Sequence, residues 1–100
     1  MPPFAALAEP TRQRIVEMLA QRERSAGEIA MACQASAPAI SQHLKVLREA
    51  RLVRVRADAQ RRIYALDRQG VEEVAAWAQS IRDFWSPRLD ALEAALKREE

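Results

Sequence analysis

Apolar residues in the middle of the chain recur at helical spacing. Ile40, Leu44 and Leu47 lie at i, i+4 and i+7, so they share one stripe of a helix. Ser36 precedes them as an N-cap, and Pro38 fits the first turn, where its missing N–H costs no hydrogen bond. The pattern predicts an amphipathic helix with a buried stripe and an exposed opposite face.

Directly after this helix the spacing changes from helical to alternating. Val53-Arg54-Val55-Arg56 alternates apolar and charged side chains, as in a strand with one buried face. We expect strands at about Leu52–Arg56 and Arg61–Leu66, joined by a turn at 57–60. The sequence thus predicts a β-hairpin, or wing, over about residues 52–66.

Two shorter helices are predicted near the N-terminus. Phe4 and Leu7 form the apolar side of the first, and Glu9-Pro10 restarts the chain. Proline is well suited to the first helical position, and the second helix is expected to reach about Gln21. Its inward positions are Ile15, Met18 and Leu19, with Arg22 as a further candidate.

A capping box marks the start of the next helix. The Ser25 oxygen caps an N–H of the first turn while Glu28 reaches back. This helix is expected over about 26–32 with Ile29 inward, followed by a turn at 33–35. Together with the amphipathic helix it predicts a helix-turn-helix over about residues 26–50.

The C-terminal third carries one long apolar stripe, predicted as a helix over about 71–98. Ser86-Pro87 interrupts it, so we expect a kink there or a restart capped by Ser86. Its aromatic residues favour a dimer interface, where they contribute large buried area, over an effector pocket. The stripe consists of Trp77, Ile81, Phe84, Trp85, Leu89, Leu92 and Leu96.

Size and composition restrict the class of protein. One hundred residues make one domain, 1–100, mainly α with a small β-hairpin. No apolar run approaches the roughly 18 residues of a membrane span, and the N-terminus does not resemble a signal peptide. We therefore expect a cytoplasmic protein with no membrane partner. The single cysteine, Cys33, cannot form an internal disulfide, which agrees with that compartment.

Positive charge is concentrated in the segment of the amphipathic helix and wing. The formal net charge of the chain is +2, but residues 45–68 carry eight basic and three acidic side chains, for +5. Residues 1–44 balance four against four, and residues 69–100 carry four basic and seven acidic side chains. Because Lys and Arg release condensed counterions when they bind phosphates, this local excess favours nucleic acid.

Three segments resemble the ArsR-type (arsenical-resistance repressor) family of winged-helix regulators. They are Leu7–Arg12, Ser41–Ala50 and Arg61–Leu66, within a similarity over about residues 4–96. The resemblance implies a winged helix-turn-helix and a homodimeric repressor of double-stranded DNA, with dimer contacts from the N- and C-terminal helices. The expected interface residues are Phe4, Leu7, Trp77, Ile81, Phe84, Trp85, Leu89 and Leu92.

Two positions depart from the family pattern. Glycine is usual where this chain has Arg51, and a left-handed arginine would cost about 1 kcal/mol. The backbone after the amphipathic helix is therefore open to a conformation other than the left-handed one. The wing turn Ala57–Gln60 also lacks the usual glycine, which leaves its conformation and register open.

The exposed face of the recognition helix carries the first candidates for DNA contact. Gln42 can pair with adenine, Lys45 suits guanine or phosphate, and Ser41 can reach a base edge or a phosphate. We expect close approach to the DNA, and contact with thymine methyl groups, at three small residues, Ala37, Pro38 and Ala39.

Further DNA-contact candidates lie on the flank of this helix and in the wing. A partly buried His43, bonded to backbone or phosphate, is favoured over a base reader or a metal ligand. Arg56, Arg61 and Arg62 are favoured for phosphate or minor-groove contact near the wing tip. Alternate strand positions face opposite ways, so not all wing arginines can take part.

The residues disfavour metal sensing. Arsenical sensors of the family carry two cysteines in the segment that matches Glu28–Ala32, where this chain has alanines. The other common family site needs a histidine on the C-terminal helix, which has none. We expect no metal and no cofactor, because one Cys and one His cannot close a tetrahedral site. A thiol switch at Cys33 stays open, although lone cysteines are more often small buried hydrophobes.

The sequence predicts a dimeric winged-helix repressor of an imperfect palindrome, with two recognition helices about 34 Å apart. A winged-helix protein-interaction module is the alternative class. No nucleophile–base pair, phosphate loop or metal motif supports an enzyme. No effector is implied, and control by concentration or by a partner protein is equally compatible.

Overall fold

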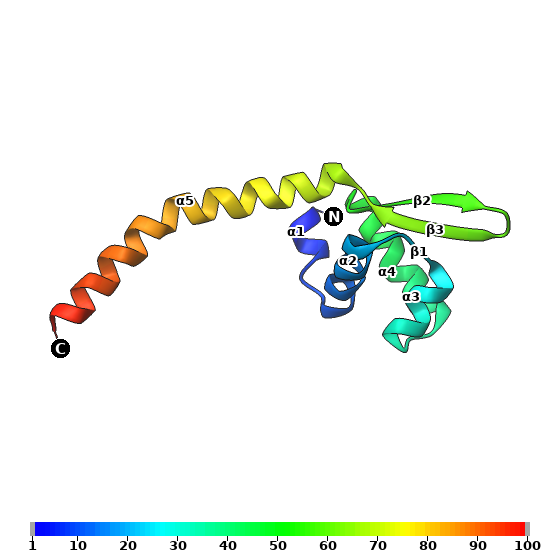
Figure 1. The fold of residues 1–100 in the computed structure, drawn as a ribbon, viewed down its shortest axis with the longest axis horizontal. Helices are drawn as coiled ribbons and strands as arrows, with labels where there is room; N and C mark the ends of the chain where they lie inside the picture. Colours follow the sequence, from blue (N-terminus) through cyan, green and yellow to red (C-terminus); the bar gives the residue numbers. More distant parts are fainter. Residues whose placement is uncertain (1, 100) are drawn as a thin grey trace.

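The structure, a computed structural model, describes residues 2–99 as a small body with two projections (Figure 1). A long helix leaves the body on one side and a β-hairpin on the other, which gives extents of 63 × 26 × 23 Å. The elements are α1 (Pro3–Ala6), α2 (Pro10–Gln21), β1 (Arg24–Ser25), α3 (Ala26–Cys33), α4 (Ala37–Glu49), β2 (Val53–Asp58), β3 (Arg61–Leu66) and α5 (Arg68–Arg98).

The predicted mainly helical fold with a wing is confirmed, and the sheet has one strand more than expected. The helix-turn-helix consists of α3 and α4, and β2 pairs with β3 as the wing. β1 pairs with the other edge of β3, so the strand order is β1-β3-β2. A strand of two residues, Arg24 and Ser25, is too short to show an alternating pattern in the sequence.

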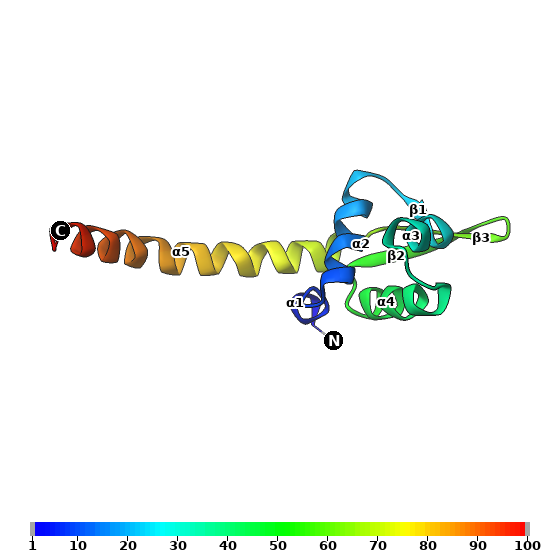
Figure 2. The same cartoon turned by 90° about the horizontal axis from the view of Figure 1, so that it is seen from below.

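The hydrophobic core lies where α2, α3 and α4 meet the sheet, and Figure 2 shows these helices gathered beside the strands. The predicted stripe of α4 is buried, as are Ile15, Leu19 and Ile29. Met18 is half-buried and Arg22 is exposed, so the inward face of α2 is narrower than expected. Further core members are Ala6, Ala50, Leu52, Val53 and Tyr64.

Both predicted N-caps of the helix-turn-helix are present. The Glu28 N–H donates to Ser25 Oγ at 3.2 Å, and the Ser25 N–H donates to Glu28 Oε1 at 3.0 Å, which completes the capping box. Ser36 Oγ accepts from the Ala39 N–H at 3.3 Å and caps α4. α3 ends at Cys33, one residue later than predicted, and Gln34 then takes a left-handed φ of 51°.

The corner after α4 keeps the left-handed conformation despite its arginine. Arg51 has a φ of 60°. Its N–H donates to the Arg48 carbonyl and the Leu52 N–H donates to the Leu47 carbonyl, both at 3.0 Å, which is a Schellman motif. The Arg51 guanidinium also donates to Gln69 Oε1 at 3.1 Å, a bond that glycine could not make. The chain therefore uses the left-handed conformation here, and not an alternative backbone conformation.

The wing turn also forms without glycine. Asp58 pairs with Arg61 across the hairpin, so the loop has two residues, Ala59 and Gln60. Ala59 takes a φ of 57°, the sign that glycine usually supplies in such turns. β2 therefore extends two residues beyond the predicted end at Arg56.

α5 differs from the prediction in two respects, its first residue and its course through Pro87. It starts at Arg68 rather than at Val71, because Asp67 Oδ1 accepts the Gln69 N–H at 3.0 Å and caps the helix. It also continues through Pro87, so the alternative of a restart capped by Ser86 is wrong. Proline removes one hydrogen bond from an exposed helix, and Figure 1 shows α5 as a gradual curve.

α5 meets the α4 corner at a contact that excludes a side chain. The Gly70 N–H donates to the Arg51 carbonyl at 2.8 Å, and the Asp67 N–H donates to the Leu52 carbonyl at 2.8 Å. A Cβ on Gly70 would lie 2.3 Å from the Arg51 carbonyl oxygen. This glycine therefore fixes how closely α5 approaches α4.

We expect Gly70→Ala to lower the free energy of unfolding by about 1–3 kcal/mol, because backbone atoms must move apart. The matched control is Gly27→Ala, whose Cβ would meet no atom closer than 3.9 Å. That change should be neutral or should stabilise by up to about 1 kcal/mol. Urea unfolding of both variants checks this, and equal stabilities would refute the close contact.

Candidate nucleic-acid interface

The burial of one stripe of α4 decides which side chains face outward. With Ile40 and Leu44 held in the core, Ser41, Gln42 and Lys45 are exposed. In the first turn Ala37, Pro38 and Ala39 are exposed as well. The structure therefore presents six of the predicted contact residues on one helix.

The wing adds an arginine to the same surface. Arg62 pairs with Ala57 across the hairpin and lies on the face of the sheet that also carries Tyr64, towards α4. Ser41, Gln42, Lys45 and Arg62 line one shallow hollow of about 160 Å³, together with Arg48 and Tyr64. We call the five polar residues of this hollow, Ser41, Gln42, Lys45, Arg48 and Arg62, the cationic face.

Arg48 is the member of the cationic face that sequence reasoning missed. Yet Ser41, Lys45 and Arg48 lie at i, i+4 and i+7, the same spacing that identifies the buried stripe. Applying that spacing to polar residues would have found it.

The cations of this face are free of acidic partners. Within residues 2–99, Lys45, Arg48 and Arg62 have no carboxylate oxygen within 4.0 Å. The other predicted wing arginines do: Arg61 contacts Asp58 at 3.7 Å, and Arg56 contacts Glu23 at 2.7 Å. Of the predicted wing arginines, Arg62 beside α4 is therefore the one whose charge is not paired within residues 2–99.

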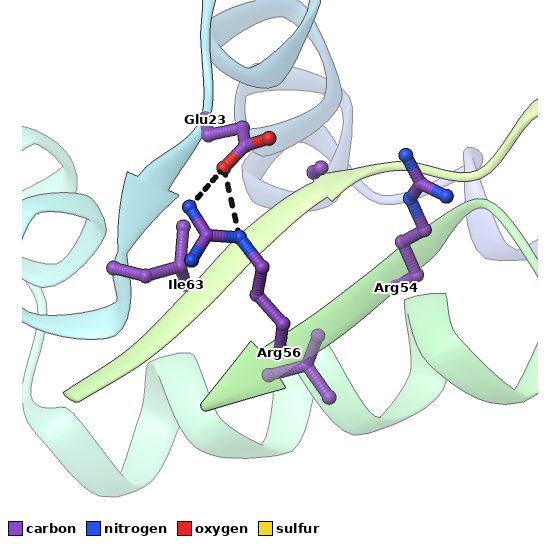
Figure 3. A pocket seen from close by; sticks show the side chains of 6 residues that line it. Glu23, Arg54, Arg56 and Ile63 are labelled. Atoms are coloured by element: carbon purple, nitrogen blue, oxygen red, sulfur yellow. Dashed lines mark hydrogen bonds and ion pairs between the residues drawn. The ribbon is translucent and has the colours of Figure 1, made fainter. Parts of the chain in front are cut away.

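Arg56 lies on the opposite, outer face of the sheet from the cationic face (Figure 3). Its Nη2 and Nε donate to Glu23 Oε2 at 2.7 and 3.3 Å, which raises the pKa of Arg56 further above its usual value. The pair joins residues 33 positions apart in the sequence, so local patterns gave no sign of it. Glu23 is thus a second residue that sequence reasoning missed.

His43 lies on the flank of α4, as predicted, and is partly buried. Its partners are side chains rather than backbone: Nδ1 lies 3.4 Å from Arg12 Nη1 and 3.7 Å from Glu9 Oε2. Arg12 Nε in turn donates to the Ala6 carbonyl at 2.6 Å. In this arrangement His43 connects α4 to the start of α2.

The predicted interface residues of the terminal helices lie on a separate part of the molecule. Phe4 stacks on Trp77 with ring centroids 5.5 Å apart, and this contact joins α1 to α5. Phe84 meets Trp85 edge to face. Leu7 is half-buried against the core, whereas the stripe of α5 is exposed, from 42% at Ile81 to 58% at Leu89.

The remaining candidate chemistry is limited. Cys33 is half-buried and packs against the core. Among the described residues, no group of three or more His, Cys, Asp or Glu side chains could hold a metal ion. No helix in residues 2–99 is both long and apolar enough to cross a membrane.

A family model and a relative of known sequence both relate this chain to bacterial transcriptional regulators. Residues 9–55 match the family model of the bacterial regulatory protein, arsR family. The HTH-type transcriptional regulator Rv2034 of Mycobacterium tuberculosis is 46% identical over 86 residues, which are 86% of this chain and 78% of that protein. The chain belongs to the ArsR family. The resemblance predicted from the sequence is confirmed, and the protein is a winged helix-turn-helix transcriptional regulator.

Solved structures of ArsR regulators agree with the fold. The crystal structure of a possible transcriptional regulator for arsenical resistance has a TM-score of 0.80 and 42% identity, and the match covers 95% of this chain and 96% of that one. The solution structure of the homodimeric winged helix-turn-helix DNA-binding domain Mb0332 from Mycobacterium bovis has a TM-score of 0.67 and 31% identity. That match covers 81% of this chain and 75% of the other.

Acid should weaken the N-cap of α2, which Glu9 supplies. The Arg12 N–H donates to Glu9 Oε2 at 2.9 Å, and this bond, with a smaller contribution from His43, holds the pKa of Glu9 below its usual 4.5. The unfolded chain then binds more protons than the folded chain in that range. The stabilisation is therefore present above about pH 4.5 and is lost as the pH falls through the folded-state pKa.

We expect the free energy of unfolding of Glu9→Gln to fall less steeply with acid than that of the unchanged protein. Urea unfolding at pH 7, 5, 4 and 3 measures the two curves. They should differ at neutral pH and converge towards pH 3. A constant difference across the series would contradict the role of the Glu9 carboxylate.

Proposed function

We propose that this ArsR regulator binds double-stranded DNA through α4 and the wing and represses transcription by occupying promoter DNA. The observation that carries the proposal is the cationic face: three cations with no acidic partner among residues 2–99 lie around Ser41 and Gln42 on the exposed side of α4. Phosphates supply the missing negative charge, and base edges supply partners for the hydroxyl and amide. An interaction module would more often expose apolar residues there.

Roles within the proposed interface follow from position. Gln42 and Ser41 read base edges in the major groove, while Lys45, Arg48 and Arg62 bind phosphates. Ala37, Pro38 and Ala39 let the start of α4 approach the groove closely, since their side chains are small. Arg61, near the wing turn, contacts flanking phosphates. We assign Arg56 to its ion pair with Glu23, and His43 to the contact with α2, rather than to DNA.

We further propose that two copies form a homodimer through α1 and the apolar stripe of α5. The stripe lies on a helix that projects from the body (Figure 1), and Phe4 continues it onto α1. The homodimeric state of the Mb0332 domain supports this assembly. A twofold axis would place the two α4 helices in successive major grooves about 34 Å apart, on an imperfect palindrome.

Gln42→Ala and Arg62→Ala should weaken DNA binding in different ways. Gln42→Ala removes a base contact, so preference for the promoter over a scrambled duplex should shrink by about 1–3 kcal/mol. Arg62→Ala removes a phosphate contact, so it should weaken both duplexes alike and lower the salt slope by about one. Fluorescence anisotropy with the protein's own promoter at two salt concentrations measures both effects.

Arg54→Ala is the matched control, because it removes one positive charge from the same hairpin on the outer face of the sheet. It should change both affinities by less than twofold. Weak, equal and salt-sensitive binding of both duplexes by the unchanged protein would contradict specific repression. The protein-interaction module would then be favoured.

Leu89→Lys should dissociate the proposed dimer, because it places a charge in the apolar stripe. Leu89 is 58% exposed in the single chain, so the fold of the chain should tolerate the change. The control Gln79→Lys adds the same charge to the other side of α5, where Asp83 is already a neighbour at 2.8 Å. Sedimentation should show monomer for the first variant and dimer for the second. A monomeric unchanged protein would refute the assembly.

A further inference from the structure

We propose that the outer face of the wing sheet binds a small organic monocarboxylate, with Arg54 as its partner. This face carries Arg54, Arg56, Ile63 and Ala65 and lies opposite the cationic face. The site is separate from the cationic face. A ligand held there would leave the exposed side of α4 free.

Strand β2 presents two guanidinium groups in the same direction. Arg54 and Arg56 are two positions apart, about 7 Å along a strand, and extend from the same side of β2 (Figure 3). A carboxylate already occupies one of them, because Glu23 Oε2 accepts two bonds from Arg56. Within residues 2–99, Arg54 has no carboxylate within 4.0 Å. Strand β2 thus has two guanidinium groups on one face. Glu23 binds that of Arg56, and that of Arg54 is available to another carboxylate.

The surroundings of Arg54 suit an apolar ligand body. Ile63 and Ala65 lie beside Arg54 and Arg56 in a hollow of about 340 Å³, within the size range of small-molecule sites. Arg54 also borders a second hollow of about 650 Å³, whose walls include Leu66 and Val71. Ligands that combine one carboxylate with an apolar group fit this combination of residues.

Nearby acidic groups restrict the charge of the ligand. Glu23 forms the rim of the first hollow, and Asp67 and Glu72 line the second. Arg68, the other cation there, already contacts Glu72 at 3.8 Å. A single negative charge can pair with Arg54, whereas a phosphate dianion or a nucleic acid would meet these carboxylates. The chemistry therefore favours a monocarboxylate over a phosphate.

Benzoate is a suitable probe for the site. We expect titration of the ¹⁵N-labelled full chain with sodium benzoate to shift the amide signals of Arg54 and Ala65, with Kd in the millimolar range. Arg54→Gln should raise Kd at least tenfold, whereas Arg61→Gln, a cation of the same hairpin, should leave it within twofold. Benzyl alcohol, the neutral counterpart, and inorganic phosphate should bind at least tenfold more weakly than benzoate.

Glu23→Gln provides a gain-of-binding test. It frees the Arg56 guanidinium, so benzoate should then also shift the amide signals around Arg56 and bind at least twofold more tightly. Equal binding of benzyl alcohol or phosphate, no loss in Arg54→Gln, or shifts confined to the cationic face would each overturn the proposal. These measurements contain no DNA, so their outcome is separate from that of the repressor experiments.

Discussion

The contact between Gly70 and the Arg51 carbonyl is the constraint on which the rest of the arrangement depends. It joins the start of the long helix α5 to the corner that ends α4, with no room for a Cβ between them. In the proposed dimer, α5 carries the interface and α4 carries the DNA contacts. The direction in which α5 leaves the body therefore sets the distance and angle between the two α4 helices. Arg51 has a left-handed backbone conformation at this corner, and its guanidinium donates a hydrogen bond to Gln69 that also joins α4 to α5.

Strand alternation places Arg62 and Arg56 on opposite faces of the wing, and the two arginines have different partners. Arg62 faces α4 and has no acidic partner among residues 2–99, so its charge is available on the cationic face. Arg56 faces the other way and is bound by Glu23, which ties β2 to the segment between α2 and β1. Two arginines of one hairpin therefore differ in role, because Arg62 supplies unpaired charge and Arg56 forms a structural ion pair. Net charge along the sequence cannot separate these roles.

Local signals in the sequence predicted most of the fold. The buried stripe of α4, the capping box at Ser25 and the alternation of β2 involve residues a few positions apart, and the structure contains all three. Predictions failed where contacts between distant segments decide the outcome. β1 exists because β3 pairs with it. The Arg56–Glu23 pair, and the turning of His43 towards α2, likewise depend on neighbours that only the folded chain provides.

The continuous course of α5 through Pro87 matters for the proposed dimer. A restart at Ser86 would interrupt the helical spacing that relates Leu89, Leu92 and Leu96 to Trp77 and Ile81. Because the helix continues, all of these side chains stay on one curved stripe. Such a stripe is too exposed to stabilise a single chain, and its burial against a second copy would couple folding to assembly. In that case the regulator's stability, and with it the number of α4 pairs able to reach DNA, depends on protein concentration.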